Sequence, residues 1–576
     1  SEYVSRNGKI ETISIQLATA SQSRVITVSV VQSQVDYIIK LITGEPVLLS
    51  ASINKNELFI QFLALLNDVG YKVLPKDIYL VAHFAQAEFG NFDRIDDIDL
   101  FQASKGLFGK YNIINPLTQT PVTIHVKDLF AILSTSLEKI GNYIGIGKLS
   151  LAGVGDKTES YWKEHMDELH KQFPDEFNTY AVRDAEICYH AYTKIRDFFL
   201  SKYEVDILHF NTLASIAGYI FRKDYLKEPV VPTRKIQVSI NQRKALADKQ
   251  TKYYKIIQKQ EIYDGSLDIR KYALWSYHGG RAESFYRGRL EGEDLAYYDV
   301  VSLYPSSAML QPLPCKETKW FNLAEVKETN PSLYEKLINA GEGFVELEFS
   351  FPKFTMYPCL PFQGARDDIL YYPLNGVSWC TLSELRLALK LGLSDYKILS
   401  GNAFLPSYKE INHPIKQYMK DVLGLKNSST KGSIEYELYK LLMNALVGKL
   451  RESFEDRTPF ELARTGLLPR QALNKVARRL IKSKSVGSLW YPEGASLILG
   501  KARSIISEFV VKGAYLCSTD SVLLPKDTDI SCASLNELRG VGSDLKQELD
   551  GSHGALIRAR LSALNPLEKY QSKRHT

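Results

Sequence analysis

The ten residues YYDVVSLYPS, from Tyr297 to Ser306, are of types and spacing that could do chemistry. An apolar, β-prone run delivers the carboxylate of Asp299, and a sharp turn follows through Ser302 and Pro305. Mg²⁺ prefers carboxylates together with phosphate oxygens, and the amides of a turn can donate to phosphates. The segment therefore predicts a site for a divalent metal and a triphosphate at the end of a strand.

Two later blocks carry compatible residues. The block KLLMNALVGKL would place Lys440, Asn444 and Gly448 on one face of a helix. A lysine there can act as a mobile point charge on a phosphate, and a glycine allows close approach to the helix. The block YLCSTDSVLL brings Asp520. Taken alone, the first also fits an amphipathic core helix and the second a turn capped by Asp.

In this order and at these separations, the three blocks resemble motifs A, B and C of family B DNA polymerases. The resemblance implies an α/β multidomain chain with a right-hand polymerase of palm and fingers. Asp299, Asp520 and the carbonyl of Val300 would hold two Mg²⁺ ions. Tyr304 would lie under the sugar and clash with a ribose 2′-hydroxyl. Besides Val300, the residues that the resemblance assigns to the nucleotide are Ser302, Leu303, Tyr304, Lys440 and Asn444, and Thr519 is assigned to DNA.

The segment YHGGRAE resembles the YxGG motif that joins the exonuclease and polymerase domains in this family. The resemblance implies that Tyr277, Gly279, Gly280 and Arg281 contact single-stranded template. Paired glycines permit close backbone approach, and an arginine could meet phosphate. A plain glycine turn before a strand is the alternative.

The first 200 residues resemble the RNase H-like 3′–5′ exonuclease domain of the same family. The segment FNTYAVRDAEICYHAY is expected as a helix with Tyr180 and Asp184 on one face, as in the exo III motif. Glu88 stands where exo II ends in Asp, and Glu2 is expected as the exo I glutamate. Lys148 is a looser match to the basic helper of this domain. Glu2 and Asp184 would hold Mg²⁺ or Mn²⁺, and two such ions can activate water and stabilise the leaving oxygen.

Several positions depart from the family pattern. Phe84 replaces the usual Asn of exo II, Val447 replaces the Tyr of motif B, and Ser518 replaces the first Asp of motif C. The Asp of exo I is expected upstream of Ser1, so the exonuclease of this chain should be impaired. An RNase H-like domain without nuclease activity is the alternative.

The long separations between motifs predict two insertions within the palm, at about 310–407 and about 452–484. The first contains strand-like runs such as GFVELEFSF and should be folded. The second ends in a stretch, 470–485, with six positive charges and no acid, which predicts contact with a DNA backbone. Such insertions are typical of the protein-primed polymerases of phages and linear plasmids. Primer-independent enzymes carry similar ones, so the priming mode stays open.

The predicted organisation is an exonuclease domain at 1–200 and a polymerase domain at 201–576. Within the latter, fingers are expected at about 408–450 and the start of a thumb at about 540–576. Residues 10–17 are expected as a strand, with 24–31 as its hairpin partner. In the KxY segment that grips primer in the family, Arg560 would take the Lys role, with Ser562 in the Tyr place. The short sequence after motif C suggests truncation at the C-terminus as well.

Composition agrees with these assignments. The chain has 576 residues, 45% hydrophobic and 24% charged, with a net charge of +6, which permits nucleic-acid binding. No apolar run reaches the roughly 18 residues of a membrane span. The expected partners are a DNA primer-template, dNTPs and, in a protein-primed enzyme, a terminal protein. We expect a monomer that is not secreted, located in the host cytoplasm or, if its gene is carried on a plasmid, in mitochondria.

Two functions from different classes follow. The first is a DNA-directed DNA polymerase with a linked exonuclease, encoded by a phage, plasmid or other mobile element. The second is a catalytically inactive DNA-binding replication factor on the same fold. Convergence of the Asp299 and Asp520 side chains would favour the polymerase. A third hypothesis, a nuclease with a vestigial polymerase module, has less support, because the exonuclease motifs match the family less well than the polymerase motifs do.

Overall fold

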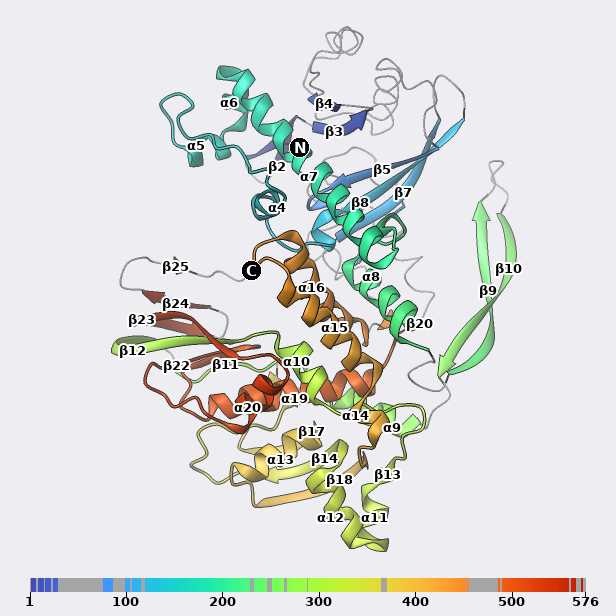
Figure 1. Ribbon diagram of the computed structural model, residues 1–576, viewed down its shortest axis with the longest axis vertical. Coiled ribbons are helices and arrows are strands. Elements are labelled where there is room, and N and C mark those ends of the chain that lie inside the picture. Colours follow the sequence, from blue (N-terminus) through green and yellow to red (C-terminus); the bar gives the residue numbers. More distant parts are fainter. Residues whose placement is uncertain are drawn as a thin grey trace. The chain divides into compact units, whose positions relative to one another are not determined.

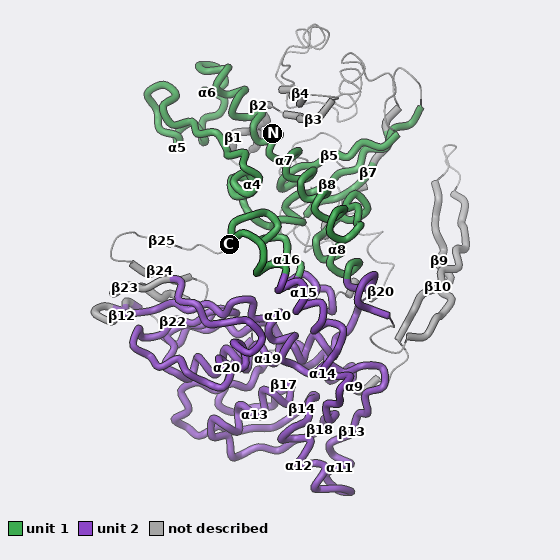
Figure 2. The backbone as a smooth tube through the Cα atoms, viewed as in Figure 1, with its two compact units in different colours: residues 1–220, 425–442, 453–486 green, residues 221–424, 443–452, 487–576 purple. Residues whose placement is uncertain are grey.

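The computed structural model describes residues 76–85, 106–114, 120–227, 267–286, 288–363, 370–451 and 489–558. It also describes the strand backbones of 2–6, 9–14, 16–21, 24–29, 99–103, 233–245, 251–263, 453–454, 485–486, 561–565 and 571–572. The secondary structure is mixed α/β, as predicted (Figure 1). Unit 1 comprises 1–220, 425–442 and 453–486, and unit 2 comprises 221–424, 443–452 and 487–576 (Figure 2). The functional division at residue 200 stays a prediction.

Unit 1 contains a four-stranded sheet with the order β5-β8-β7-β6. Strand β5 (Asp77–Ala82) runs parallel to β8 (Pro121–Asp128), which pairs antiparallel with β7 (Gly106–Ile114). β7 in turn pairs antiparallel with β6 (Asp99–Ala103). Alternate residues of β8 are buried, as the two-residue period of a strand requires.

The long helix α7 (Pro174–Tyr203) is the helix predicted from the exo III segment. Pro174 occupies its first turn, where a missing N–H costs nothing and φ is preset. Phe177, Ala181 and Ile187 are among its buried side chains. Helices α4 (Leu137–Ile144), α5 (Glu159–Glu164), α6 (Met166–Gln172) and α8 (Leu213–Ile220) also lie in this unit.

Near the N-terminus, the expected strand at 10–17 is wrong. β2 (Lys9–Ser14) pairs with β1 (Glu2–Arg6), whereas β3 (Gln16–Ser21) pairs with β4 (Arg24–Ser29). The pairing runs from Gln16 with Ser29 to Ser21 with Arg24, so the hairpin partner of β4 is 16–21 and not 10–17. Glu2 does begin the first strand, as expected for the exo I position.

Unit 2 is centred on a seven-stranded sheet with the order β11-β21-β22-β12-β23-β24-β25. Its central strand, β12 (Gly288–Val300), lies between β22 (Ser521–Pro525) and β23 (Leu545–Arg558). The remaining strands are β11 (Ala282–Ser284), β21 (Leu516–Ser518), β24 (Leu561–Asn565) and β25 (Gln571–Ser572). A buried cluster joins this sheet to α10 (Leu303–Leu310), α19 (Pro492–Val510) and α20 (Ala533–Gly540).

The segment between motifs A and B is folded, as predicted. Its four-stranded sheet has the order β13-β18-β14-β17. The strands are β13 (Phe321–Asn322), β14 (Glu342–Ser350), β17 (Asn375–Thr381) and β18 (Asp395–Phe404). Helices α11 (Leu323–Thr329), α12 (Pro331–Ala340) and α13 (Leu382–Lys390) share its buried core. A small hairpin, β15 (Phe362–Gln363) with β16 (Leu370–Tyr371), accompanies them.

The predicted fingers region is helical. It contains α14 (Tyr408–Ile411), α15 (Pro414–Ser428) and α16 (Ile434–Lys449). Lys440, Asn444 and Gly448 are all exposed, whereas Leu438 and Leu442 are buried. The shared face predicted for motif B is therefore confirmed. Helix α16 contributes to both units, with its residues up to Leu442 in unit 1 and those from Met443 in unit 2.

Some predicted sites lie outside the described residues. These are Glu88, Arg560 and nearly all of the second insertion. For Glu2 and Ser562 only the strand backbone is described. Their proposed roles stay predictions. Among the described helices, none combines the length and apolar character needed to cross a membrane.

Candidate active site

Asp299 and Asp520 lie side by side at neighbouring strand ends. Asp299 is the penultimate residue of β12, and its partner across the sheet is Ser521, the residue after Asp520. The backbone N–H of Val300 donates to the carbonyl oxygen of Asp520 at 2.8 Å. Both aspartates are partly exposed. The predicted strand of motif A and hairpin of motif C are confirmed, and they bring the two acidic residues together.

A partly buried tyrosine, Tyr297, is affected by the charge of both carboxylates. The Tyr297 hydroxyl lies 2.5 Å from the hydroxyl of Ser521. Burial raises the pKa of Tyr297, and the negative charges of Asp520 and Asp299 raise it further. Both carboxylates therefore act electrostatically on one neutral phenol, as expected if they converge near the strand ends.

Both aspartate-bearing segments turn through left-handed backbone. Ser302 has φ 55° and precedes α10, and Thr519 has φ 64° in the β21–β22 turn. Non-glycine residues enter this region at a cost of roughly 1 kcal/mol or more, so surrounding contacts must hold them there. For Thr519, one such contact is the hydrogen bond from its N–H to the carbonyl of Arg281 at 2.8 Å.

Three of the predicted motifs meet at Gly280. A Cβ atom at this position would lie 2.8 Å from the Tyr304 hydroxyl and 2.8 Å from Cγ2 of Thr519. Any side chain would therefore displace the turn that carries Asp520 or the tyrosine of motif A. Gly279, in contrast, is exposed, and a Cβ there would meet nothing within 4 Å.

The expected role of Arg281 needs correction. Its guanidinium is buried and donates to Glu283 at 2.7 Å, to the Ser507 hydroxyl at 2.9 Å and to the Pro358 carbonyl at 2.8 Å. It also stacks on Tyr372, with 4.1 Å to the ring centroid. With these contacts it cannot reach a DNA phosphate from this position. Arg281 anchors the segment, and the backbone of the glycines remains available for DNA.

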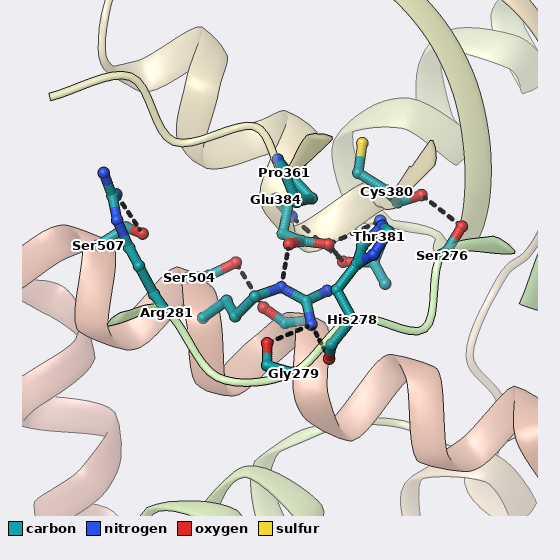
Figure 3. Close-up of polar contacts among 12 residues, drawn as sticks. Ser276, His278, Gly279, Arg281, Pro361, Cys380, Thr381, Glu384, Ser504 and Ser507 are labelled. Atoms are coloured by element: carbon teal, nitrogen blue, oxygen red, sulfur yellow. Dashed lines mark hydrogen bonds and ion pairs between the residues drawn. The ribbon is translucent and has the colours of Figure 1, made fainter. Parts of the chain in front are cut away.

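A buried ion pair lies next to this segment (Figure 3). Nε of Arg503, on α19, donates to Glu384 Oε1 at 2.7 Å, and both side chains are only 1% exposed. A second guanidinium nitrogen of Arg503 donates to the His278 carbonyl at 2.6 Å and to the Gly279 carbonyl at 3.3 Å. The pair therefore fixes the backbone immediately before Gly280.

Glu384 is itself fixed at the start of α13. Its Oε2 atom accepts from the backbone N–H and the hydroxyl of Thr381, both at 2.9 Å, in a capping box. His278 Nε2 contacts the Trp379 carbonyl at 2.9 Å, so this nitrogen must donate. Burial, followed by the charge of Arg503, lowers the pKa of His278 and keeps the ring neutral. The folded insertion thus holds the glycine segment through Glu384 and Trp379.

In unit 1, the structure brings together Lys148, Asp184 and Tyr180. The Lys148 ammonium lies 2.8 Å from the Asp184 carboxylate and 5.7 Å from the centroid of the Tyr180 ring. Asp184 is partly exposed, whereas Tyr180 is buried. Lys148, which matched the family pattern only loosely, therefore lies beside Asp184, the predicted exonuclease acid.

A further acid, Asp128, was missed from the sequence. Its carboxylate accepts from the backbone N–H groups of Phe84, Ala85, Leu107 and Phe130 at 3.0–3.2 Å. Burial raises its pKa, although these donors oppose the change. Phe84 has a left-handed φ of 62°. Asp128 therefore fixes the backbone at Phe84 and Ala85, in the segment predicted as exo II. The position of Asp128 at the end of a β-prone run was the available sequence signal.

The donor set at the strand ends fits Mg²⁺. Across the described residues, no group of three or more His, Cys, Asp and Glu side chains gathers as a metal cluster. Mg²⁺ is commonly held by one or two carboxylates, with water and substrate phosphates as its other ligands. The two partly exposed carboxylates of Asp299 and Asp520 meet that requirement.

The family model for organellar and viral type B DNA polymerases matches residues 105–457. This chain belongs to that family. It is 26% identical over 341 residues to the primer-independent DNA polymerase PolB of Escherichia coli, covering 58% of this chain and 36% of that protein. It is 23% identical over 379 residues to a probable DNA polymerase of Neurospora intermedia, covering 59% of this chain and 34% of that protein. The chain thus spans about a third of the length of these relatives.

Solved structures confirm the fold. The phi29 DNA polymerase complexed with primer-template DNA and incoming nucleotides matches with a TM-score of 0.53 at 14% identity, covering 98% of this chain and 88% of that chain. The same polymerase complexed with single-stranded DNA matches with a TM-score of 0.54 at 13% identity, covering 98% of this chain and 89% of that chain. The chain therefore has the predicted architecture, an exonuclease-type domain followed by palm and fingers.

Glu384→Gln should destabilise the chain. The change leaves the fully buried Arg503 guanidinium without its counter-ion, and breaking such a pair costs about 3–5 kcal/mol. Urea unfolding followed by circular dichroism measures the difference. The control is Glu348→Gln, an exposed acid on β14, which should change stability by less than about 0.5 kcal/mol. Equal stability of the two variants would contradict a structural role for the pair.

Proposed function

We propose that this chain is a DNA-directed DNA polymerase that joins dNTPs to a primer 3′ end. One observation carries the proposal: neighbouring strands place Asp299 beside Asp520, with the Val300 N–H donating to the Asp520 carbonyl at 2.8 Å. Family membership and the phi29 polymerase fold support the same conclusion.

The residues take distinct roles in this reaction. Asp299 and Asp520 would hold Mg²⁺, together with the Val300 carbonyl. Bound Mg²⁺ supplies charge that favours loss of the 3′-hydroxyl proton and offsets the charge of the triphosphate and pyrophosphate. The amides after Ser302 bind phosphate oxygens, and the exposed Lys440 and Asn444 of α16 contact the nucleotide. Tyr304, next to Gly280, restricts the space around the sugar.

We also propose a linked but impaired 3′–5′ exonuclease. Its active-site residues are Glu2, Glu88, Tyr180 and Asp184, with Mg²⁺ or Mn²⁺ held by Glu2 and Asp184. The contact between Lys148 and Asp184 supports a charged site on this face of α7. Two departures from the family pattern support a slow enzyme. Phe84, which has left-handed backbone, replaces the usual Asn. Glu88 stands where the family has Asp.

The biological role we propose is replication of a phage, plasmid or other mobile element. Priming by a terminal protein fits the folded insertion between motifs A and B and the phi29-like fold. Synthesis without a primer is the other candidate, because the Escherichia coli relative is named primer-independent. Incubating the chain with unprimed single-stranded circles and dNTPs separates them, since only the second mode yields product.

Asp520→Asn should reduce Mg²⁺-dependent primer extension by at least about a thousandfold while leaving DNA binding largely intact. The amide keeps the shape of the side chain and removes the charge that holds the metal. Primer extension on a gel and oligonucleotide anisotropy measure the two properties. Asp527→Asn, an exposed acid just beyond β22, serves as the control and should extend normally. Robust extension by Asp520→Asn would contradict the assignment of Asp520 as a metal ligand.

Tyr304→Val should raise ribonucleotide incorporation relative to deoxyribonucleotide by roughly tenfold or more, since a lost steric clash is worth about 1–3 kcal/mol. Tyr304→Phe retains the ring and should keep the discrimination of the original chain. Single-nucleotide incorporation with dCTP and CTP gives the ratio. An unchanged ratio in the valine variant would remove Tyr304 from the sugar pocket.

Glu88→Asp should accelerate degradation of single-stranded DNA, by up to about a hundredfold. The reason is that a misplacement of about 1 Å, the length of one methylene, can cost that much in rate. Release of 3′ nucleotides from a 5′-labelled oligonucleotide is the measurement. Asp184→Ala added to this variant should remove the activity. A rate that Asp184→Ala leaves unchanged would show that the hydrolysis comes from elsewhere.

A further inference from the structure

An exposed indole lies close to the glycine segment. Trp275 is the last residue of α9 (Leu267–Trp275) and is 50% exposed, whereas Trp162 in unit 1 is 1% exposed. Its ring centroid lies 4.6 Å from that of Trp379 on β17, and Tyr272 stacks on Trp379 at 5.2 Å. The three rings form what we term the aromatic platform. Packing fixes its inner rings and leaves a large part of Trp275 in solvent.

The chain runs directly from the platform to the candidate active site. Tyr277 comes two residues after Trp275. The guanidinium of Arg451 lies over the Tyr277 ring, 4.0 Å from its centroid. Arg451 is exposed and Tyr277 partly exposed. Gly279 follows, exposed and with open space where a side chain would be. At Gly280, which comes next, an added Cβ atom would lie 2.8 Å from Cγ2 of Thr519, the residue before Asp520.

The platform is also tied rigidly to this segment. His278, between Tyr277 and Gly279, donates to the carbonyl of Trp379 itself, at 2.9 Å. Its own carbonyl accepts from Arg503 at 2.6 Å. The position of the rings relative to the glycines is therefore set by buried contacts, which a preorganised binding surface requires.

We propose that the aromatic platform and Arg451 form a binding surface for single-stranded DNA, with Trp275 stacking on an unpaired base. An aromatic face, a neighbouring cation and an open glycine backbone are the features that bind single strands without sequence preference. The bases of a duplex are already stacked on each other, so an exposed indole distinguishes unpaired template from duplex. This inference rests on the proposed polymerase function, because it assigns the template strand to that surface.

Trp275→Ala tests the proposal. A base–aromatic stack is worth about 1–3 kcal/mol, so affinity for an oligothymidylate should fall by about fivefold to about 150-fold. Affinity for a blunt duplex should stay within about twofold. Anisotropy of a labelled oligothymidylate with the 576-residue chain, without metal or dNTP, gives both values. Tyr396→Ala is the matched control, a 38% exposed aromatic on β18, which β14 separates from β17.

Trp275→Phe provides a second test that does not depend on the folding of the alanine variant. Phenylalanine keeps a stacking face, so affinity should remain within about threefold of the original chain. The quenching of tryptophan fluorescence by oligothymidylate should fall, because the exposed indole is gone. Arg451→Ala should lower the salt dependence of binding, with a slope smaller by about 0.7.

The outcomes separate this inference from the proposed function. If Trp275→Ala binds oligothymidylate as tightly as the original chain, or loses duplex affinity equally, the inference is wrong, whatever extension assays show. An aromatic surface that serves a protein partner would give the first of these results. If Asp520→Asn extends primers normally while Trp275→Ala loses single-strand affinity, the polymerase proposal fails and the binding surface stands.

Discussion

The ion pair between Arg503 and Glu384 constrains much of unit 2. Both side chains are 1% exposed, so each charge is stable in the interior only because the other lies 2.7 Å away. Glu384 caps α13 of the insertion, and Arg503 holds the carbonyl groups of His278 and Gly279. The insertion, α19 and the glycine segment therefore keep one relative position.

The turn that carries Thr519 and Asp520 depends on that position. The carbonyl of Arg281 accepts the N–H of Thr519, and Gly280 leaves room for Thr519 and Tyr304. The left-handed Thr519 thus rests on a segment held from both sides, by Arg503 before Gly280 and by the Arg281 side chain after it. We infer that the insertion between motifs A and B supports the geometry of Asp520, whatever else it binds.

Local patterns predicted the parts of the fold that depend on neighbours in the chain. The strand, turn and helix around Asp299, the Asp520 hairpin and the exposed face of α16 each follow from a few consecutive residues. Arg503 and Glu384, in contrast, are 119 positions apart, and Asp128 holds Phe84 across 44 positions. Sequence spacing gives no sign of such contacts. The assignment of Arg281 to phosphate failed for the same reason, because its partners Ser507 and Pro358 are distant in sequence.

The central claim is that Asp299 and Asp520 form one metal site. Mn²⁺ binding in the presence of a dNTP, followed by electron paramagnetic resonance, tests it most directly. An Asp184→Ala background excludes the exonuclease site. The account predicts that about two ions bind per chain, as in two-metal sites, and that Asp299→Asn and Asp520→Asn each weaken binding of the same ions. Unchanged stoichiometry and affinity in both variants would contradict it.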